Sequence, residues 1–329
     1  MDNNLAVITG ATGHIGYALL KKLAERGDHV RILIRKDTDQ FDGIPCEKVF
    51  GDVTDPASLK TAFEGADVVY HLAGIIDINV GHEEKIWRVN FEGTINVVEA
   101  CRTCGVRRLV YASSVDVYEP LPDNEVMREM DHFNPDALDG TYAKSKATAT
   151  NYVLDSCRRG DLDAVVVYPG ACIGPYDFKV SNVGEMVRVF MHGSFPASLS
   201  FGAYNFVDVR DVADGMALAA EKGSNGEGYI LCGEQISTDE FINVVAEACG
   251  KKSPHFHIGK TVGSGAAPLM EVFYKVSHTT PMFTRYTIRK LLSNCNFSIE
   301  KAKNELGYAP MSVRQSVQDM VQWIRDNEE

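Results

Sequence analysis

The sequence has no apolar run long enough to cross a membrane, because the longest fall short of the roughly 18 residues that a spanning helix needs. Its first residues, Met1 to Asn4, lack the basic and then apolar pattern of a secretory leader. We therefore expect no membrane insertion and a cytoplasmic location.

Positive charge is also scarce. The chain has 33 lysines and arginines against 45 aspartates and glutamates, a formal net charge of -12, and its basic residues form no cluster. An acidic surface repels phosphate backbones, so we expect no nucleic-acid partner.

The eight cysteines are scattered along the chain. Cys101 and Cys104 form a CxxC pair, but the sequence has no second ligand pair to complete a zinc site. We expect reduced thiols, helix-face packing for this pair, and no metal site.

What the sequence does contain is a regular alternation of short apolar runs and amphipathic stretches. Parallel strands need long crossover connections, and helices usually provide them. The alternation predicts an α/β fold with a doubly wound parallel sheet of about seven strands. Strands are expected at 5–8, 30–34, 49–50, 68–72, 109–111 and 164–168, and helices at 14–26, 56–63, 83–104 and 142–154.

The regularity ends at Pro169 and Gly170, where a stretch punctuated by Gly and Pro begins. The runs 206–209 and 211–221 indicate a strand and a helix that return to the main sheet, and the tail from about 238 is expected to mix helix and loop. We predict a dinucleotide-binding domain of residues 1–170 plus about 205–235. Residues of about 171–204 plus 236–329 form a smaller, mostly helical substrate-binding lobe.

A glycine-rich segment lies between the first strand and the first helix. Glycines permit a tight turn and close approach to a pyrophosphate, and a helix N-terminus offers unpaired N–H donors. The order of strand, glycine-rich loop and helix predicts a dinucleotide site. Its expected cofactor-binding residues are Gly10, Thr12, Gly13, His14, Ile15 and Gly16.

The second strand ends in Arg35 and Lys36, where an NAD-selective protein usually has an acidic residue for the ribose 2'-hydroxyl. A cation there suits a 2'-phosphate, so both residues are expected cofactor contacts and NADP(H) is favoured over NAD(H). Asp37 and Asp39 lie close by, and exposed basic residues at a strand end are often only solvated. NAD(H) therefore stays open.

Tyr142 and Lys146 are four residues apart in an expected helix and so project from one face. An ammonium beside a phenol favours the phenolate and lowers the phenol pKa, which makes Tyr142 a candidate general acid or base. Ser113 and Ser114 follow the strand at 109–111, at the carboxyl edge where ligands of such sheets bind. A hydroxyl there can donate to a substrate oxygen.

Several motifs occur in one order along the chain: TGATGHIG, GDVTD, LAG at 72–74, VNFEGT at 89–94, YASSVDVY and YAKSK at 142–146. As a set they resemble the extended short-chain dehydrogenases/reductases of the NAD-dependent epimerase/dehydratase family over about residues 5–235. The resemblance implies that Ser114 orients the substrate oxygen, Tyr142 exchanges the proton and Lys146 assists. It also implies cofactor contacts or support at Asp52, Val53, Leu72, Ala73, Gly74, Asn90, Tyr142, Lys146 and Pro169.

Within that family the chain is most similar to the dihydroflavonol-reductase and 3β-hydroxysteroid-dehydrogenase branch, through HLAGI at 71–75, YPGACIGP at 168–175 and FVDVRDVA at 206–213. The expected small-molecule substrate is a bulky apolar ketone, aldehyde or secondary alcohol, because the lobe is rich in large apolar residues and a sugar diphosphate would need basic ones. Arg210 and Arg285 remain candidates for a phosphate. The apolar residues include Tyr176, Phe178, Phe190, Met191, Phe195, Phe201, Tyr204, Met270, Phe273, Tyr274, Met282 and Phe283.

Two other functions stay open. The first is a sugar-nucleotide epimerase or dehydratase with tightly bound NAD(P). Asp116 stands where dehydratases have a glutamate, but Val115 replaces its acidic neighbour, so a solvated or turn-capping Asp116 is favoured. The second is a non-catalytic nucleotide sensor, which has no need of a tuned phenol.

Assembly is the least determined feature. The resemblance implies a possible homodimer through the helices at 83–104 and 142–157. The stretch 266–274 could form an amphipathic helix that touches a membrane or a partner.

Overall fold

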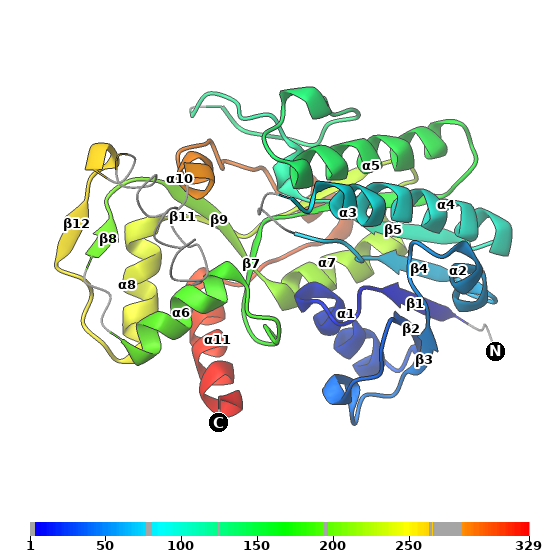
Figure 1. Cartoon of the computed structure of the whole chain (residues 1–329), viewed down its shortest axis with the longest axis horizontal. Coiled ribbons are helices and arrows are strands. Elements are labelled where there is room, and N and C mark those ends of the chain that lie inside the picture. Colours follow the sequence, from blue (N-terminus) through cyan, green and yellow to red (C-terminus); the bar gives the residue numbers. More distant parts are fainter. Residues whose placement is uncertain are drawn as a thin grey trace.

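The computed structural model describes residues 4–76, 81–123, 125–193, 197–262, 265 and 285–328. No helix in these ranges is long and apolar enough to cross a membrane. The chain forms a large parallel sheet covered by helices and a smaller C-terminal part with sheets of its own (Figure 1). The lobe residues Phe195, Met270, Phe273, Tyr274, Met282 and Phe283, and the stretch 266–274, lie outside the described ranges.

The main sheet has seven strands: β1 (Leu5–Thr9), β2 (His29–Ile34), β3 (Glu47–Phe50), β4 (Val68–His71), β5 (Arg108–Ala112), β6 (Ala164–Pro169) and β10 (Gly228–Leu231). All pair in parallel, in the order β10-β6-β5-β4-β1-β2-β3. Every residue of β1 and β6 is buried, as expected for strands covered on both faces. The predicted doubly wound sheet is confirmed, and its switch point lies between β1 and β4.

Helices cover both faces of this sheet. One face carries α1 (His14–Glu25) and α7 (Val209–Lys222). The opposite face carries α2 (Pro56–Phe63), α4 (Gly93–Cys104) and α5 (Thr141–Arg158). On α4, Cys101 is buried and the Cys104 sulfur lies 3.7 Å from the Lys60 carbonyl oxygen.

The helix expected at 83–104 is continuous but not uniform. α3 (Glu83–Trp87) leads into a π-helical turn, Arg88–Glu92, from which α4 continues. Turns of this kind are rare and frequently mark functional sites. Asn90 lies in the π turn and is buried, so the wider turn of the helix places a polar side chain in the protein interior.

The C-terminal part has a third apolar core of its own. A sheet in the order β11-β9-β7 combines β7 (Ala171–Ile173), β9 (Ala203–Asp208) and β11 (Glu234–Ser237). A second sheet pairs β8 (Ala197–Leu199) with β12 (Phe256–Ile258). The helices of this part include α6 (Asn182–His192), α8 (Thr238–Cys249), α10 (Arg285–Leu291), the π-helical segment Ala302–Leu306 and α11 (Val313–Asn327), so a helical C-terminal part is confirmed (Figure 1).

One strand differs from the expectation. The run at 206–209 was expected in the main sheet, but β9 pairs with β7 and β11 in the small one, and β10 is the seventh main strand. The apolar residues of β9 predict that the strand is buried, but they do not predict which strand it pairs with, because strand pairing depends on tertiary packing. The helix α7 does return to the main sheet. The domain boundaries stay a prediction.

Candidate active site

The glycine-rich loop brings two backbone segments into close contact. Gly10 has φ +80°, and a Cβ atom there would lie 2.6 Å from the Ala73 nitrogen. A Cβ on Gly16 would lie 2.3 Å from the Gly10 carbonyl oxygen. No side chain caps α1 at Gly13. The loop thus fits the diphosphate of a dinucleotide, because its backbone is accessible and N–H donors at the start of α1 point outward.

A cleft of about 140 Å³ lies at the carboxyl edge of the sheet, beside this loop. Residues from β1 and β2, from the loops that follow β1, β2, β3 and β4, and Val89 of the π turn form its walls. One further side chain, Lys179, comes from the C-terminal part and was not predicted. The expected cofactor residues that line the cleft are Gly10, Thr12, Gly13, Arg35, Asp52, Val53, Leu72, Ala73 and Gly74.

Other expected cofactor residues lie around the cleft rather than on its walls. His14, Ile15 and Gly16 form the first turn of α1, and the His14 Nε2 atom is 2.8 Å from the Pro175 carbonyl oxygen. Lys36 is exposed beyond the end of β2. Pro169 ends β6 at the same edge of the sheet.

The acidic residues near Arg35 do not pair with it. Asp37 Oδ1 accepts a hydrogen bond from Lys48 Nζ at 2.9 Å, and this bond lowers the pKa of Asp37. Asp52 Oδ1 accepts hydrogen bonds from the backbone N–H and the hydroxyl of Thr54, at 2.9 and 2.8 Å. The Arg35 side chain thus lines the cleft without a described carboxylate partner.

Lys146 lies on α5 and is buried beneath the carboxyl end of β5. Its Nζ donates to the Ala112 carbonyl oxygen at 2.5 Å and to the Tyr111 hydroxyl at 3.2 Å, and lies 4.5 Å from the centre of the Tyr111 ring. Burial lowers the pKa of Lys146 to about 7, because the ammonium loses its hydration. Its charge is therefore sensitive to pH near neutrality.

Ser114 and Tyr142 lie close to this lysine in the fold, and Tyr142 is also close to it in the chain. Ser114 follows β5 two residues after Ala112, and its Oγ accepts the Asp116 N–H at 3.1 Å. Tyr142 lies one helical turn before Lys146. Both side chains are buried. The structure thus gathers the predicted catalytic set at one edge of the sheet, although the roles stay predictions.

Asn90 supports this edge from the π turn. Its Oδ1 accepts the Ile75 N–H at 2.7 Å, and its Nδ2 donates to the Ile75 carbonyl oxygen and to Ser145 Oγ, both at 3.1 Å. Ser145 Oγ in turn donates to the Tyr142 carbonyl oxygen at 2.8 Å. Asn90 therefore ties the cofactor cleft at Ile75 to the first turn of α5.

A buried polar network beneath the site was not predicted. The His71 ring lies between the hydroxyls of Thr9, at 2.7 Å, and Thr94, at 3.1 Å. Burial and the charge of Lys146 lower the pKa of His71 to about 3, so the ring is neutral. Burial raises the pKa of Tyr111, and the nearby hydroxyls of Thr94 and Thr150 partly offset that rise. The sequence offered one sign of this network: Thr9 and His71 are polar residues in strands that are otherwise apolar.

Two further sequence hypotheses concern charged side chains. Asp116 is neither merely solvated nor only a turn cap, because its Oδ1 is ion-paired with Lys290 Nζ of α10 at 2.7 Å. Arg210 pairs with Asp208 at 2.7 Å and with Asp319 at 2.6 Å, so its guanidinium is engaged by two carboxylates; a phosphate role for it stays a prediction. The side chain of Arg285 lies outside the described residues.

An apolar cavity of about 270 Å³ lies in the C-terminal part. Thr287 and Leu291 of α10 line it, and Lys290 on the same helix pairs with Asp116 beside Ser114. The cavity is thereby linked to the catalytic edge through one short helix. Its large apolar lining residues include Val183, Met186, Leu199, Tyr204, Phe206, Phe241 and Ile242.

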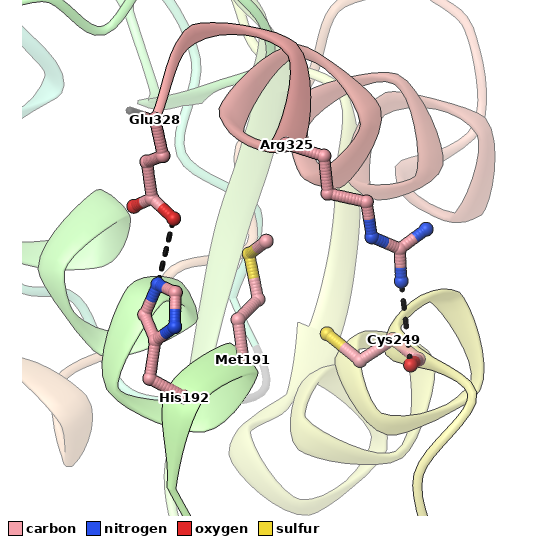
Figure 2. A pocket seen from close by; sticks show the side chains of 5 residues that line it. All are labelled: Met191, His192, Cys249, Arg325 and Glu328. Atoms are coloured by element: carbon pink, nitrogen blue, oxygen red, sulfur yellow. Dashed lines mark hydrogen bonds and ion pairs between the residues drawn. The ribbon is translucent and has the colours of Figure 1, made fainter.

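A larger cavity, about 740 Å³, lies where α6, α8 and α11 end (Figures 1 and 2). Figure 2 shows that its polar groups engage one another: His192 Nε2 is 2.6 Å from Glu328, and Arg325 donates to the Cys249 carbonyl oxygen at 3.3 Å. None of the predicted site residues lines it. The candidate site therefore comprises the cleft and the apolar cavity.

Comparisons with known proteins extend over nearly the whole chain. A model of the NAD-dependent epimerase/dehydratase family matches residues 6–232. Sterol demethylase protein B of Methylococcus capsulatus is 34% identical, over 97% of this chain and 98% of that protein. A putative dihydroflavonol 4-reductase of Synechocystis sp. is 29% identical, over 97% and 94%. The crystal structure of gox2253 is 33% identical and covers 98% of both chains, with a TM-score of 0.85.

Proposed function

Because this chain belongs to the NAD-dependent epimerase/dehydratase family of oxidoreductase-type enzymes, we propose that it interconverts a ketone or aldehyde and an alcohol on a bulky apolar substrate. The observation that carries the proposal is the grouping of Ser114, Tyr142 and Lys146 at the edge shared with the dinucleotide cleft. An apolar cavity, rather than a basic one, is linked to this edge through α10.

The catalytic residues would divide the work of reduction. When bound, the cofactor supplies a hydride from its nicotinamide to the carbonyl carbon. The Tyr142 hydroxyl gives its proton to the carbonyl oxygen, and the Ser114 hydroxyl donates a hydrogen bond to that oxygen as negative charge develops. The Lys146 ammonium stabilises the phenolate that remains on Tyr142. In oxidation, Tyr142 takes the proton from the alcohol.

The preferred cofactor in this proposal is NADP(H). Arg35 lines the cleft at the end of β2, the position that contacts the adenosine ribose in such sheets. Asp37 is directed to Lys48 instead of the cleft, so it does not supply the carboxylate that would bind a 2'-hydroxyl. Lys36 and Arg35 together keep this end of the cleft positively charged.

The substrate class follows from the apolar cavity. Bound ligands place apolar groups on apolar walls and need a few polar groups for orientation. Phe206 and Phe241 both line the cavity, and their rings stack with 4.1 Å between the ring centroids. Two relatives are named for a sterol demethylase and a dihydroflavonol reductase, which agrees with a bulky ring system.

A sugar-nucleotide epimerase or dehydratase is the alternative. A dehydratase needs both an acid and a base, whereas here Asp116 is paired with Lys290 and its neighbour is Val115. The alternative predicts turnover without a net change in nicotinamide absorbance. The reductase predicts stoichiometric loss of that absorbance.

We also propose a homodimer through α4 and α5. Half-buried aromatic rings of Trp87, Phe91 and Tyr152 connect the helix containing α4 to α5, with centroid separations of 5.8 and 6.5 Å. Light scattering on the purified protein should give twice the mass of one chain. A mass equal to a single chain across micromolar concentrations would remove this proposal.

The test of the reaction uses NADPH and NADH with a panel of steroid and flavonoid-like ketones and a panel of sugar nucleotides. Tyr142→Phe should lower kcat by about 10²- to 10⁴-fold, because the proton donor is lost. Tyr152→Phe, on the same helix, is the control and should leave kcat unchanged. Retention of most turnover by a folded Tyr142→Phe protein would show that another group moves the proton.

A further inference from the structure

The loop between β7 and α6 reaches back to the glycine-rich segment. His14 contacts the Pro175 carbonyl oxygen at 2.8 Å, and the Tyr17 ring on α1 lies 5.2 Å from the ring of Tyr176 and 4.9 Å from that of Phe178. Figure 1 shows this segment between α1 and α11. A piece of the C-terminal part therefore forms one side of the nucleotide cleft.

The backbone of this loop is held in an unfavourable conformation. Tyr176 and Val180 have φ angles of 74° and 47°, a region that β-branched residues in particular avoid. Asp177 is buried and secures the turn, because its carboxylate accepts the Ser181 N–H and, at 2.7 Å, the Ser181 hydroxyl. Strain that is held by such contacts clusters at ligand-binding positions.

Lys179, between the two strained residues, points into the cleft. Its Nζ donates to Thr12 Oγ1 at 2.9 Å. Burial and the nearby positive charge of Arg35 lower the pKa of Lys179. Among the described residues, no carboxylate forms an ion pair with Lys179 or Arg35, so two cations from different parts of the chain face the same space.

We propose that Lys179 binds the 2'-phosphate of NADP(H) together with Arg35, so that the C-terminal part contributes directly to cofactor selection. This inference rests on the proposed preference for NADP(H). Arg35 directly follows β2, at the strand end where the adenosine ribose lies in sheets of this kind. The start of α1 offers N–H donors to the pyrophosphate. An anion between the cations would relieve their repulsion and gain charge-assisted hydrogen bonds.

The test is a set of dissociation constants measured without substrate. Lys179→Met, Lys179→Arg and a control, Lys252→Met at an exposed position beyond α8, are titrated with NADPH, NADH and adenosine 2',5'-bisphosphate. Lys179→Met should weaken NADPH and the bisphosphate by about 10- to 100-fold, the range for a hydrogen bond between charged groups, and leave NADH within about twofold. Lys179→Arg should recover most of the affinity, and the control should match the wild type.

Each outcome is informative. Equal weakening of NADPH and NADH would mean a pyrophosphate contact and overturn the assignment to the 2'-phosphate. Unchanged NADPH affinity in Lys179→Met would overturn any cofactor role. If the wild-type protein binds NADPH no more tightly than NADH, the proposed cofactor preference itself fails. The melting temperature of Lys179→Met without cofactor should stay near the wild-type value, because the variant loses one exposed hydrogen bond, to Thr12 Oγ1, and no ion pair with a described carboxylate.

Discussion

Removal of a single hydroxyl, by Tyr111→Phe, tests whether the buried network sets the charge of Lys146. Lys146 Nζ donates two hydrogen bonds within the described residues, and the Tyr111 oxygen accepts one of them at 3.2 Å, while the Tyr111 ring centre lies 4.5 Å from Nζ. Phenylalanine keeps the ring and loses the acceptor. A hydrogen bond to a charged group contributes about 1.5–3 kcal/mol, and one pKa unit corresponds to about 1.4 kcal/mol. The pKa of Lys146, about 7 in the wild type, should therefore fall by about one to two units.

The titration can be followed by NMR on protein labelled with ¹³C-lysine, with Lys146→Met to assign the signal. The cost to folding should be modest, about 1 kcal/mol, because Thr94 and Thr150 keep hydrogen bonds to backbone carbonyl oxygens at 2.7 Å. At pH 7 the variant should lose kcat for carbonyl reduction, since less of Lys146 is charged, and regain part of it at lower pH.

Tyr168→Phe is the matched control. Tyr168 is a buried tyrosine on the neighbouring strand β6, and its hydroxyl has no hydrogen-bond partner among the described residues. Its removal should leave the Lys146 midpoint in place and stability equal or slightly higher. The reasoning fails if Tyr111→Phe leaves the midpoint unmoved or raises it. It also fails if Tyr168→Phe lowers the midpoint as much.

Two further predictions concern backbone contact and pH. Gly16→Ala places a Cβ 2.3 Å from the Gly10 carbonyl oxygen and should weaken cofactor binding more than about tenfold, or 1.4 kcal/mol, as measured by calorimetry. The control is Gly259→Ala, whose Cβ would have no described atom within 4 Å and should leave cofactor affinity unchanged. Burial raises the pKa of Asp211 to about 6, so the folded protein binds more protons than the unfolded chain between about pH 4 and 6, and stability falls as pH rises through that interval. In Asp211→Asn the amide oxygen can still accept the Met311 N–H, so the variant should lose this dependence and gain about 1–2 kcal/mol in urea unfolding at pH 8. A variant that keeps the wild-type pH dependence would contradict the assignment to Asp211.

Much of the main sheet could be predicted from the sequence because its strands and helices alternate with distinct periods. Strands buried on both faces appear as continuous apolar runs, as in the segment Ala164–Pro169, and Pro56 marks the start of α2. The placement of β9 could not be predicted, because apolar composition does not identify the neighbouring strand. The π turn at Arg88–Glu92 was also invisible, since its hydrophobic pattern resembles that of an α-helix.

The site was predictable where one short segment supplies several residues. The glycine-rich loop and the pair Tyr142 and Lys146 are of this kind. Contacts between distant segments were missed: Lys179 and Thr12 are 167 positions apart, and Lys290 and Asp116 are 174 apart. Such pairs have no local periodicity, so only the fold brings them together.

The late position of β10 in the chain has a consequence for synthesis on the ribosome. Strand β6 is apolar throughout, yet its outer neighbour β10 emerges only after β7, α6, β9 and α7 have been made. Until β10 is made, the outer edge of β6 has unpaired backbone N–H and C=O groups, and such an edge can pair with strands of other molecules. Translation that stalls between residues 170 and 228 should therefore yield aggregates, not a smaller folded protein, and the C-terminal segments shield the nascent sheet only once its edge strand is complete.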